Sequence, residues 1–237
     1  EQHIKREKAT SNVCTATALM ATMSGMYAVY NGPAEIAEKA RRTHKYAVKI
    51  AERLKKSGYE IANENFFDTV EVKNLSQEKI EEIRKRALAA GINFMYLPNA
   101  IRFSTDELTD CHEAHTIMEE IFGTEHQPCC KEKRADGFTL APEHKCCSEL
   151  ALGGMKRETP FLTEKVFNSY HSETQMMRFI KMLERKDISL AHSMIPLGSC
   201  TMKLNAAVEM LPLSWSELTN VHPFAPKDQV EGYMQLI

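Results

Sequence analysis

The stretch that decides the fold is FFDTVEVK, at residues 66–73. Within it, Val70 and Val72 alternate with threonine and charged residues. An apolar residue at every second position predicts a strand that buries one face and leaves the other in water. The stretch therefore predicts one strand of a sheet that is covered on one side.

Further elements are predicted directly after this strand. Ser76–Ala90 has helical periodicity and is followed by Gly91, a residue type that commonly ends helices. Asn93–Leu97 and Ala100–Phe103 are short apolar runs separated by a Pro-Asn turn, which predicts two more strands.

Two helices are predicted before the strand. Ser11 or Asn12 can cap a helix that runs to about Tyr30, and this helix is apolar on most sides, so we expect it to be buried. Residues 31–33, Asn-Gly-Pro, break it. A second helix with one apolar stripe then continues to Gly58.

The order of these elements indicates the fold class. Ser104 and Glu107 form an S-x-x-E capping box, which predicts a last helix through Phe122. Helices and short strands in this order predict an α/β protein, with an α+β-like small domain at residues 31–124. We expect its sheet to be mainly antiparallel, with helices on one face.

The rest of the chain has a less regular sequence pattern. Residues 125–158 have no periodicity, which indicates a linker or insertion. Ser172 and Gln175 form another capping box, before a helix to about Lys186. From Ala191 onward proline and glycine recur, so we interpret this part as an arm or a set of loops and not as a domain with its own core.

Composition excludes several functional classes. The 237 residues are 43% hydrophobic and 26% charged, with a net charge of −2, which is typical of a soluble globular protein. Neither the charge nor its distribution indicates nucleic-acid binding or a membrane surface, and no apolar run is long enough to span a bilayer. Seven scattered cysteines, an odd number, favour a reducing compartment over a disulfide framework.

Three polar clusters are candidate sites. Residues 6–15 place hydroxyls, an amide and cations before a helix, where N-capping competes with anion binding. Residues 194–205 combine glycine, hydroxyls, a thiol and Lys203, a mixture that could face an anionic ligand. Residues 222–226 hold His222 in a proline-stiffened segment that could present it to a site or simply pack as an arm.

A zinc site is a weaker alternative. Four cysteines lie within the linker near two histidines, but they occur as adjacent pairs. Zinc ligands usually follow C-x₂-C spacing, because adjacent thiolates project apart. We therefore expect no metal site. The cysteines concerned are Cys129, Cys130, Cys146 and Cys147.

These clusters carry a resemblance to the P-protein family of the glycine cleavage system. The match runs in order along nearly the whole chain and is weakest over 125–158. The segments that carry it are residues 6–15, 26–33, 171–187, 193–205, 222–226 and 231–233.

The resemblance implies a fold and a division of the chain. Family members are built from two halves, each similar to a fold-type I aminotransferase. The chain would then comprise the end of the first half's large domain (1–30), its small domain (31–124), a linker (125–158) and the N-terminal arm of the second half (159–237). It would be an internal fragment that spans the junction of the halves.

The resemblance also implies a chemistry. Family members use pyridoxal phosphate to decarboxylate glycine and transfer the aminomethyl group to the lipoyl arm of H-protein. They are expected to be homodimers, cytoplasmic or in the mitochondrial matrix. The lysine that holds the cofactor would lie beyond Ile237, so we assign no catalytic residue here, and the fragment alone is expected to be inactive and to bind no cofactor.

Site residues are assigned from the same resemblance. The residues expected near substrate or cofactor are Ser199, Cys200, Thr201, Asn205 and His222. Those expected at the entrance of the cleft are Ser11, Asn12 and Cys14. The competing functional class is a non-catalytic structural or interaction module.

Overall fold

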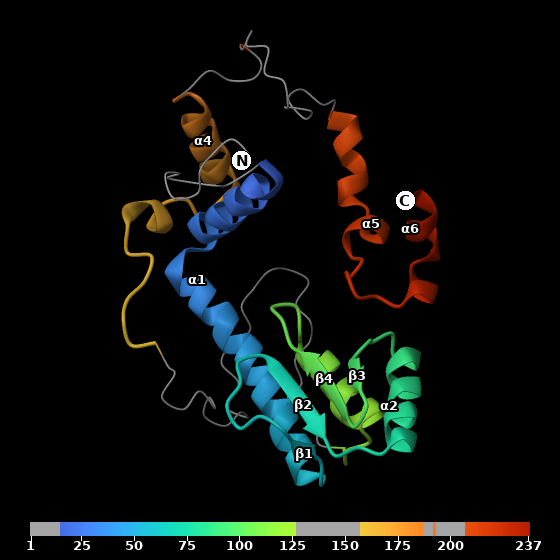
Figure 1. The fold of residues 1–237 in the computed structure, drawn as a ribbon. Helices are drawn as coiled ribbons and strands as arrows, with labels where there is room; N and C mark the ends of the chain where they lie inside the picture. The colour runs from blue at the N-terminus through green and yellow to red at the C-terminus, as the bar shows by residue number, and fades with distance from the viewer. Residues whose placement is uncertain (1–14, 127–156, 187–191, 193–206) are drawn as a thin grey trace, which may run out of the picture. The chain divides into compact units, whose positions relative to one another are not determined.

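The computed structural model describes residues 15–126, 157–186, 192 and 207–237. The chain divides into two compact units, Glu1–His171 and Ser172–Ile237. Each unit is described by itself (Figure 1).

The longest element is α1, Thr15–Lys56, which contains a break at Gly32 with φ 69° and ψ 175°. Pro33 follows the break inside the helix. The predicted interruption at 31–33 is therefore confirmed, although the backbone resumes its helix at once. The segment after the break carries the predicted apolar stripe, and Ala47, Ala51 and Leu54 on it are buried.

A four-stranded antiparallel sheet lies beside the second segment of α1 (Figure 1). Its order is β1-β2-β4-β3, formed by Glu60–Ile61, Thr69–Lys73, Ala100–Ser104 and Met95–Leu97. In the β2–β4 register, Val70 faces Phe103 and Val72 faces Ile101. All four side chains are buried, so the predicted period-2 pattern and the antiparallel sheet are both confirmed.

The hydrophobic core lies between this face of the sheet and the helices. α2, Gln77–Ala89, contributes Ile80, Ile83 and Ala87, and the Ser76 hydroxyl caps it by accepting from the Lys79 amide. The helix that ends the domain contributes Ile117 and Phe122. On the opposite face of the sheet, Arg102 pairs with Glu71. The small domain is thus a mixed α and β unit with one polar sheet face.

The last helix of the domain begins later than the capping box predicts. It starts as α3, Cys111–His115, where the Asp110 carboxylate accepts from the Glu113 amide, and continues as the π-helix η2, Thr116–Ile121. Ser104 cannot cap a helix because it is the last residue of β4, opposite Thr69. The predicted box at Ser104 and Glu107 is therefore wrong.

The first segment of α1 is exposed, which contradicts the expectation that it is buried. Leu19 and Met20 are 67% and 63% exposed, and Met23 is 55% exposed. Between Leu19 and Tyr30, only Val29 is buried. The sequence pattern identified an apolar helix correctly, but the described part of this chain does not supply the surface that would cover it.

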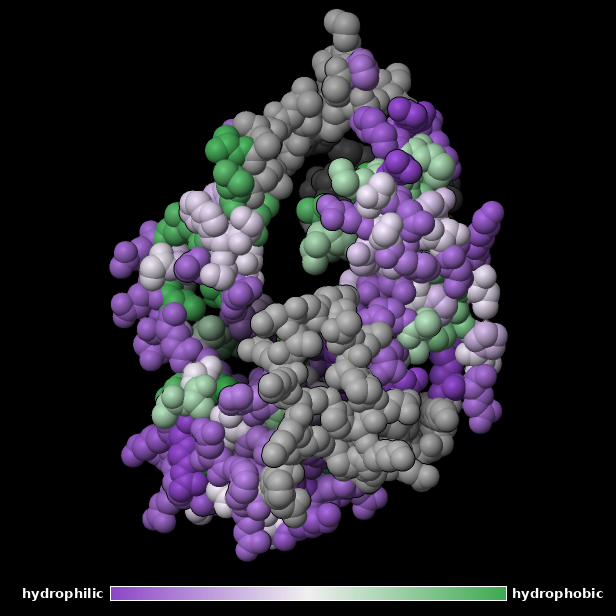
Figure 2. All heavy atoms as spheres, turned by 180° about the vertical axis from the view of Figure 1, so that it is seen from behind, coloured by the Kyte–Doolittle hydropathy of each residue, from purple (hydrophilic) through white to green (hydrophobic). Residues whose placement is uncertain are grey.

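The second unit consists of short helices. α4, Glu173–Glu184, is capped by the Ser172 hydroxyl as predicted, and four short helical segments follow beyond residue 206. These are η5 (Ala207–Ser214), α5 (Ser216–Thr219), η6 (Lys227–Gln229) and α6 (Glu231–Leu236). Hydrophobic atoms lie at the surface of residues 207–237, at the left of Figure 2. Among them, Trp215 and Phe224 are exposed.

Candidate functional site

Most residues predicted to line a site lie outside the described part of the chain. These are Ser11, Asn12, Cys14, Ser199, Cys200, Thr201 and Asn205. Lys203 and the four linker cysteines lie outside it as well. The assignments for these residues therefore stay predictions, and His222 is the member of the set whose geometry can be described.

His222 forms a tight turn with the residues that follow. Its carbonyl accepts from the Ala225 amide at 2.9 Å, and its Nδ1 accepts from the Phe224 amide at 3.1 Å. A neutral ring that accepts at Nδ1 carries its proton on Nε2. The turn therefore fixes the tautomer and holds an imidazole donor beside the ring of Phe224, which is 90% exposed.

A second polar site surrounds the break in α1. A β-carbon added to Gly32 would lie 2.8 Å from the Phe167 carbonyl oxygen and 2.8 Å from Cε1 of His171. Both belong to residues 157–171, which we call the strap, and its helix η4, Lys165–Asn168, packs against α1. The His171 Nδ1 lies 2.8 Å from the Tyr30 carbonyl oxygen, so the ring donates to the backbone at the break.

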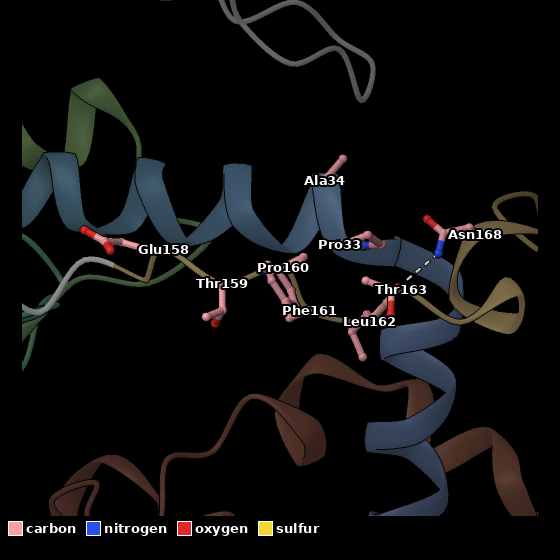
Figure 3. Close-up of a pocket in the computed structure, with 9 residues that line it drawn as sticks. All are labelled: Pro33, Ala34, Glu158, Thr159, Pro160, Phe161, Leu162, Thr163 and Asn168. Atoms are coloured by element: carbon pink, nitrogen blue, oxygen red, sulfur yellow. Dashed lines mark hydrogen bonds between the residues drawn. The ribbon is translucent and has the colours of Figure 1, made fainter.

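The strap leaves a cavity of about 700 Å³ beside the break (Figure 3). Pro33 and Ala34 form one side, and strap residues 158–163 with Asn168 form the other. The Asn168 amide is occupied, because it donates to the carbonyls of Leu162 and Glu164 at 3.0 Å. The cavity is mainly apolar and does not gather titratable groups.

Near the break, two side chains of α1 and one from the loop after β4 form a network. The Tyr27 hydroxyl donates to Glu107 at 2.8 Å, and Lys39 lies 3.2 Å from that hydroxyl and 3.4 Å from the same carboxylate. Burial raises the pKa of Tyr27, and the hydrogen bond to Glu107 adds to the rise. Burial opposes the charge on Lys39, but its contacts with Tyr27 and Glu107 outweigh this effect and raise its pKa. At neutral pH Tyr27 is therefore a neutral phenol and Lys39 an ammonium.

A third cluster pairs one carboxylate with two imidazoles. Glu119 lies 3.1 Å from Nδ1 of His115 and 2.7 Å from Nδ1 of His126. Burial lowers the pKa of His115, the charge of Lys49 lowers it further, and Glu119 partly offsets both. Within the described ranges no three His, Cys, Asp or Glu residues are arranged to hold a metal ion.

Cys111 differs from the expectation of free thiols. It is disulfide-bonded, and Lys49 lies 3.5 Å from its sulfur. The odd number of scattered cysteines did not predict this bond.

The groups that contact the break were not predicted from the sequence. Residues 31–33 were identified as an interruption, but Glu107 and His171 lie 80 and 141 residues from the partners that they bind. The one available signal was the Gly-Pro pair itself, since a glycine at a helix break often marks a positive φ or a close approach.

The fold and the exposed helices define a class of protein. It is a small α+β domain attached to apolar helical segments that the described chain leaves uncovered. No helix of the described residues is long and apolar enough to cross a membrane.

Comparison with known proteins identifies the family. The model of the glycine cleavage system P-protein family matches residues 1–121, about half of the chain. The chain belongs to this family.

Individual relatives agree with the family match. Proteins named glycine dehydrogenase (decarboxylating) from Vibrio parahaemolyticus and Bacteroides thetaiotaomicron are 46% and 49% identical over 238 residues. A protein of the same name from Aliivibrio fischeri is 46% identical over 239 residues. Each match covers 100% of this chain and 24% of the relative. The chain thus spans about a quarter of the length of these relatives.

Proposed function

We propose that this chain is a structural part of a pyridoxal-phosphate-dependent glycine decarboxylase. The whole enzyme would decarboxylate glycine and pass the aminomethyl group to the lipoyl arm of H-protein. Family membership and the activity named for the relatives support this proposal. By the same resemblance, we propose that the enzyme is a homodimer in the cytoplasm, or in the mitochondrial matrix of a eukaryote.

The observation that carries the proposal is uncovered apolar surface in both units. Met20 and Met23 are exposed on the first segment of α1, and Trp215 and Phe224 are exposed in the second unit. Contiguous exposed apolar surface usually marks an interface. Because the relatives are about four times as long as this chain, we propose that this surface packs against the remainder of such a polypeptide.

This proposal assigns a role to each region. Residues 1–30 complete a large domain, 31–124 form the small domain of an aminotransferase-like half, 125–158 link the halves, and 159–237 form the arm of the second half. In the arm, Ser199, Cys200 and Thr201 would border the substrate, with Asn205 and His222 in support. Ser11, Asn12 and Cys14 would line the entrance. The tight turn at His222 supports its role, because it fixes the ring in one tautomer.

The described residues do not fit the cofactor itself. A lysine that anchors pyridoxal phosphate is normally desolvated, and the buried polar residues among those described are four threonines and His44. Lys39 is occupied by Tyr27 and Glu107. By the same resemblance, we propose that the cofactor is anchored elsewhere in the longer polypeptide.

A chimeric enzyme tests this function. The matching quarter of the Vibrio parahaemolyticus relative is replaced by these 237 residues, and release of labelled CO₂ from carboxyl-labelled glycine is measured with lipoylated H-protein and pyridoxal phosphate. We expect activity in the chimera and none in the 237-residue chain alone. The variant Thr201→Ala should reduce turnover, while the matched control Thr163→Ala, in the strap, should not.

The outcomes separate the competing functions. A chimera that folds and binds pyridoxal phosphate but releases no CO₂ would contradict the proposal and favour a non-catalytic interaction module. A stoichiometric visible absorbance band in the isolated chain with pyridoxal phosphate, shifted by glycine, would make Lys203 the first candidate anchor and refute the assignment. Stoichiometric zinc in the purified chain would support the zinc alternative.

A further inference from the structure

The break in α1 leaves backbone groups without helical partners. In a continuous helix the Val29 carbonyl would accept from residue 33, but Pro33 has no N–H. The positive φ of Gly32 also directs the chain away from the path that would pair the Tyr30 carbonyl with Ala34. Proline is a common cause of a sharp helix kink of this kind, and the groups around it help to set the kink angle.

The strap holds one side of the break. The His171 imidazole satisfies the Tyr30 carbonyl, and the Phe167 carbonyl lies where only a glycine at position 32 leaves room. The imidazole thus acts as a remote cap on the first segment of α1. Position 32 requires glycine for two reasons: its φ is positive, and a β-carbon there would collide with the Phe167 carbonyl.

The Tyr27 network forms a second set of contacts at the break. Lys39, one residue of the second segment, binds the Tyr27 hydroxyl and the Asn31 amide oxygen of the first segment. Asn31 in turn donates to the Tyr27 carbonyl at 2.8 Å. One ammonium therefore bridges the two segments of the broken helix.

Glu107 ties this network to the sheet domain. Its carboxylate accepts from Tyr27, and its carbonyl accepts from Arg42 at 2.8 Å. The loop that carries it is held in a turn by Asp106, which accepts from the amides of Leu108 and Thr109. The first segment is thus connected to two separate parts of the unit.

We propose that these two sets of contacts form a lock that fixes the angle of the α1 bend. The lock sets the direction in which the first segment presents its exposed apolar side chains to a covering surface. On the strap side, the contacts are made by the Phe167 carbonyl and the His171 ring, and the bend turns about them. On the Tyr27 side, the contacts are made by three polar side chains within reach of water, so these contacts can break and re-form. This inference is independent of the catalytic proposal.

Distance measurement between spin labels tests the lock in the 237-residue chain. Labels are attached through noncanonical amino acids at Ser24, in the first segment, and at Lys85, on α2; both side chains are exposed. We expect one narrow distance distribution in the wild type. His171→Phe keeps a ring but removes the donor, and Glu107→Gln keeps the shape but removes the charge. Each should broaden the distribution, and the double variant should add a second population.

A matched control is available on α2. Glu82→Gln removes the charge of an exposed carboxylate that pairs with Lys79 and Arg86, far along the chain from the break, and should leave the distribution unchanged. Amide protection at Val72 and Ile101 reports whether the sheet of each variant is intact. A double variant with an intact sheet and the wild-type width would overturn the lock, as would a wild-type distribution that is already broad.

Discussion

Gly32 and Phe167 lie so close that a β-carbon on the glycine would be 2.8 Å from the phenylalanine's carbonyl oxygen. The glycine also has a φ of 69° with an extended ψ, a region almost confined to glycine. We expect Gly32→Ala to lower the free energy of unfolding by about 1–3 kcal/mol, measured by urea denaturation. Gly25→Ala is the control, since no atom lies within 4 Å of its β-carbon. Equal losses in both variants would contradict the strained break.

The start of the last helix distinguishes the observed cap from the predicted one. Asp110→Ala removes the carboxylate that binds the Glu113 amide and should cost about 1 kcal/mol of stability. Ser104→Ala removes only an exposed hydroxyl contact with Thr69 and should cost less than about 0.5 kcal/mol. Thermal unfolding of the two variants measures the difference. A larger loss of stability in Ser104→Ala than in Asp110→Ala would instead support the capping box predicted at Ser104 and Glu107.

His115 should make stability depend on pH. Burial lowers its folded-state pKa below the ordinary value of 6.5, so the unfolded chain binds more protons in that window. Its contribution to stability is therefore complete above pH 6.5 and declines as the pH falls through the folded pKa. His115→Gln should flatten this part of the curve in pH-dependent denaturation. If the slope of stability against pH is the same in the variant as in the wild type, another group titrates in this pH window.

The charge of Lys49 offers a direct check on the same histidine. Lys49 lowers the pKa of His115, second only to burial. Lys49→Met should therefore move that pKa upward, as measured by titration of the imidazole NMR signals. A pKa that moves downward or stays in place would contradict the proposed electrostatic contact.

Phe122 should be a main determinant of core stability. It is 1% exposed and its ring contacts those of Tyr59, Phe94 and Phe103. Phe122→Ala should cost about 3–5 kcal/mol in urea denaturation. Leu108→Ala, at a side chain that is 83% exposed, should change stability by less than about 0.5 kcal/mol. A small effect at Phe122 would mean that the core repacks around the lost ring.

Local patterns predicted the central elements of the small domain. The alternation around Val70 and Val72 and the periodicity of 76–90 correspond to β2 and α2, with ends that differ by a few residues at most. These elements succeed because the residues that define them also form the core. β1 was missed, since two residues carry no periodicity and the strand exists only through its pairing with β2.

Contacts between residues far apart in the sequence explain the features that local patterns could not predict. Ser104 has a capping sequence around it, but pairing with Thr69 extends β4 through it. The first segment of α1 has the composition of a buried helix, yet burial depends on a surface that sequence pattern cannot supply. In the candidate sites, His222 has a defined turn, whereas the contacts at Gly32 depend on residues too distant in sequence for any local motif.

The sheet ends in β1 and β3, which contain two and three residues. Edge strands this short expose few unpaired backbone groups, so they are poor templates for strands from other molecules. Aggregation by edge-to-edge strand addition is therefore disfavoured in this domain. If purified chains associate, we expect the exposed apolar helices, and not the sheet, to form the contacts between molecules. Mild detergent should then disperse the assemblies.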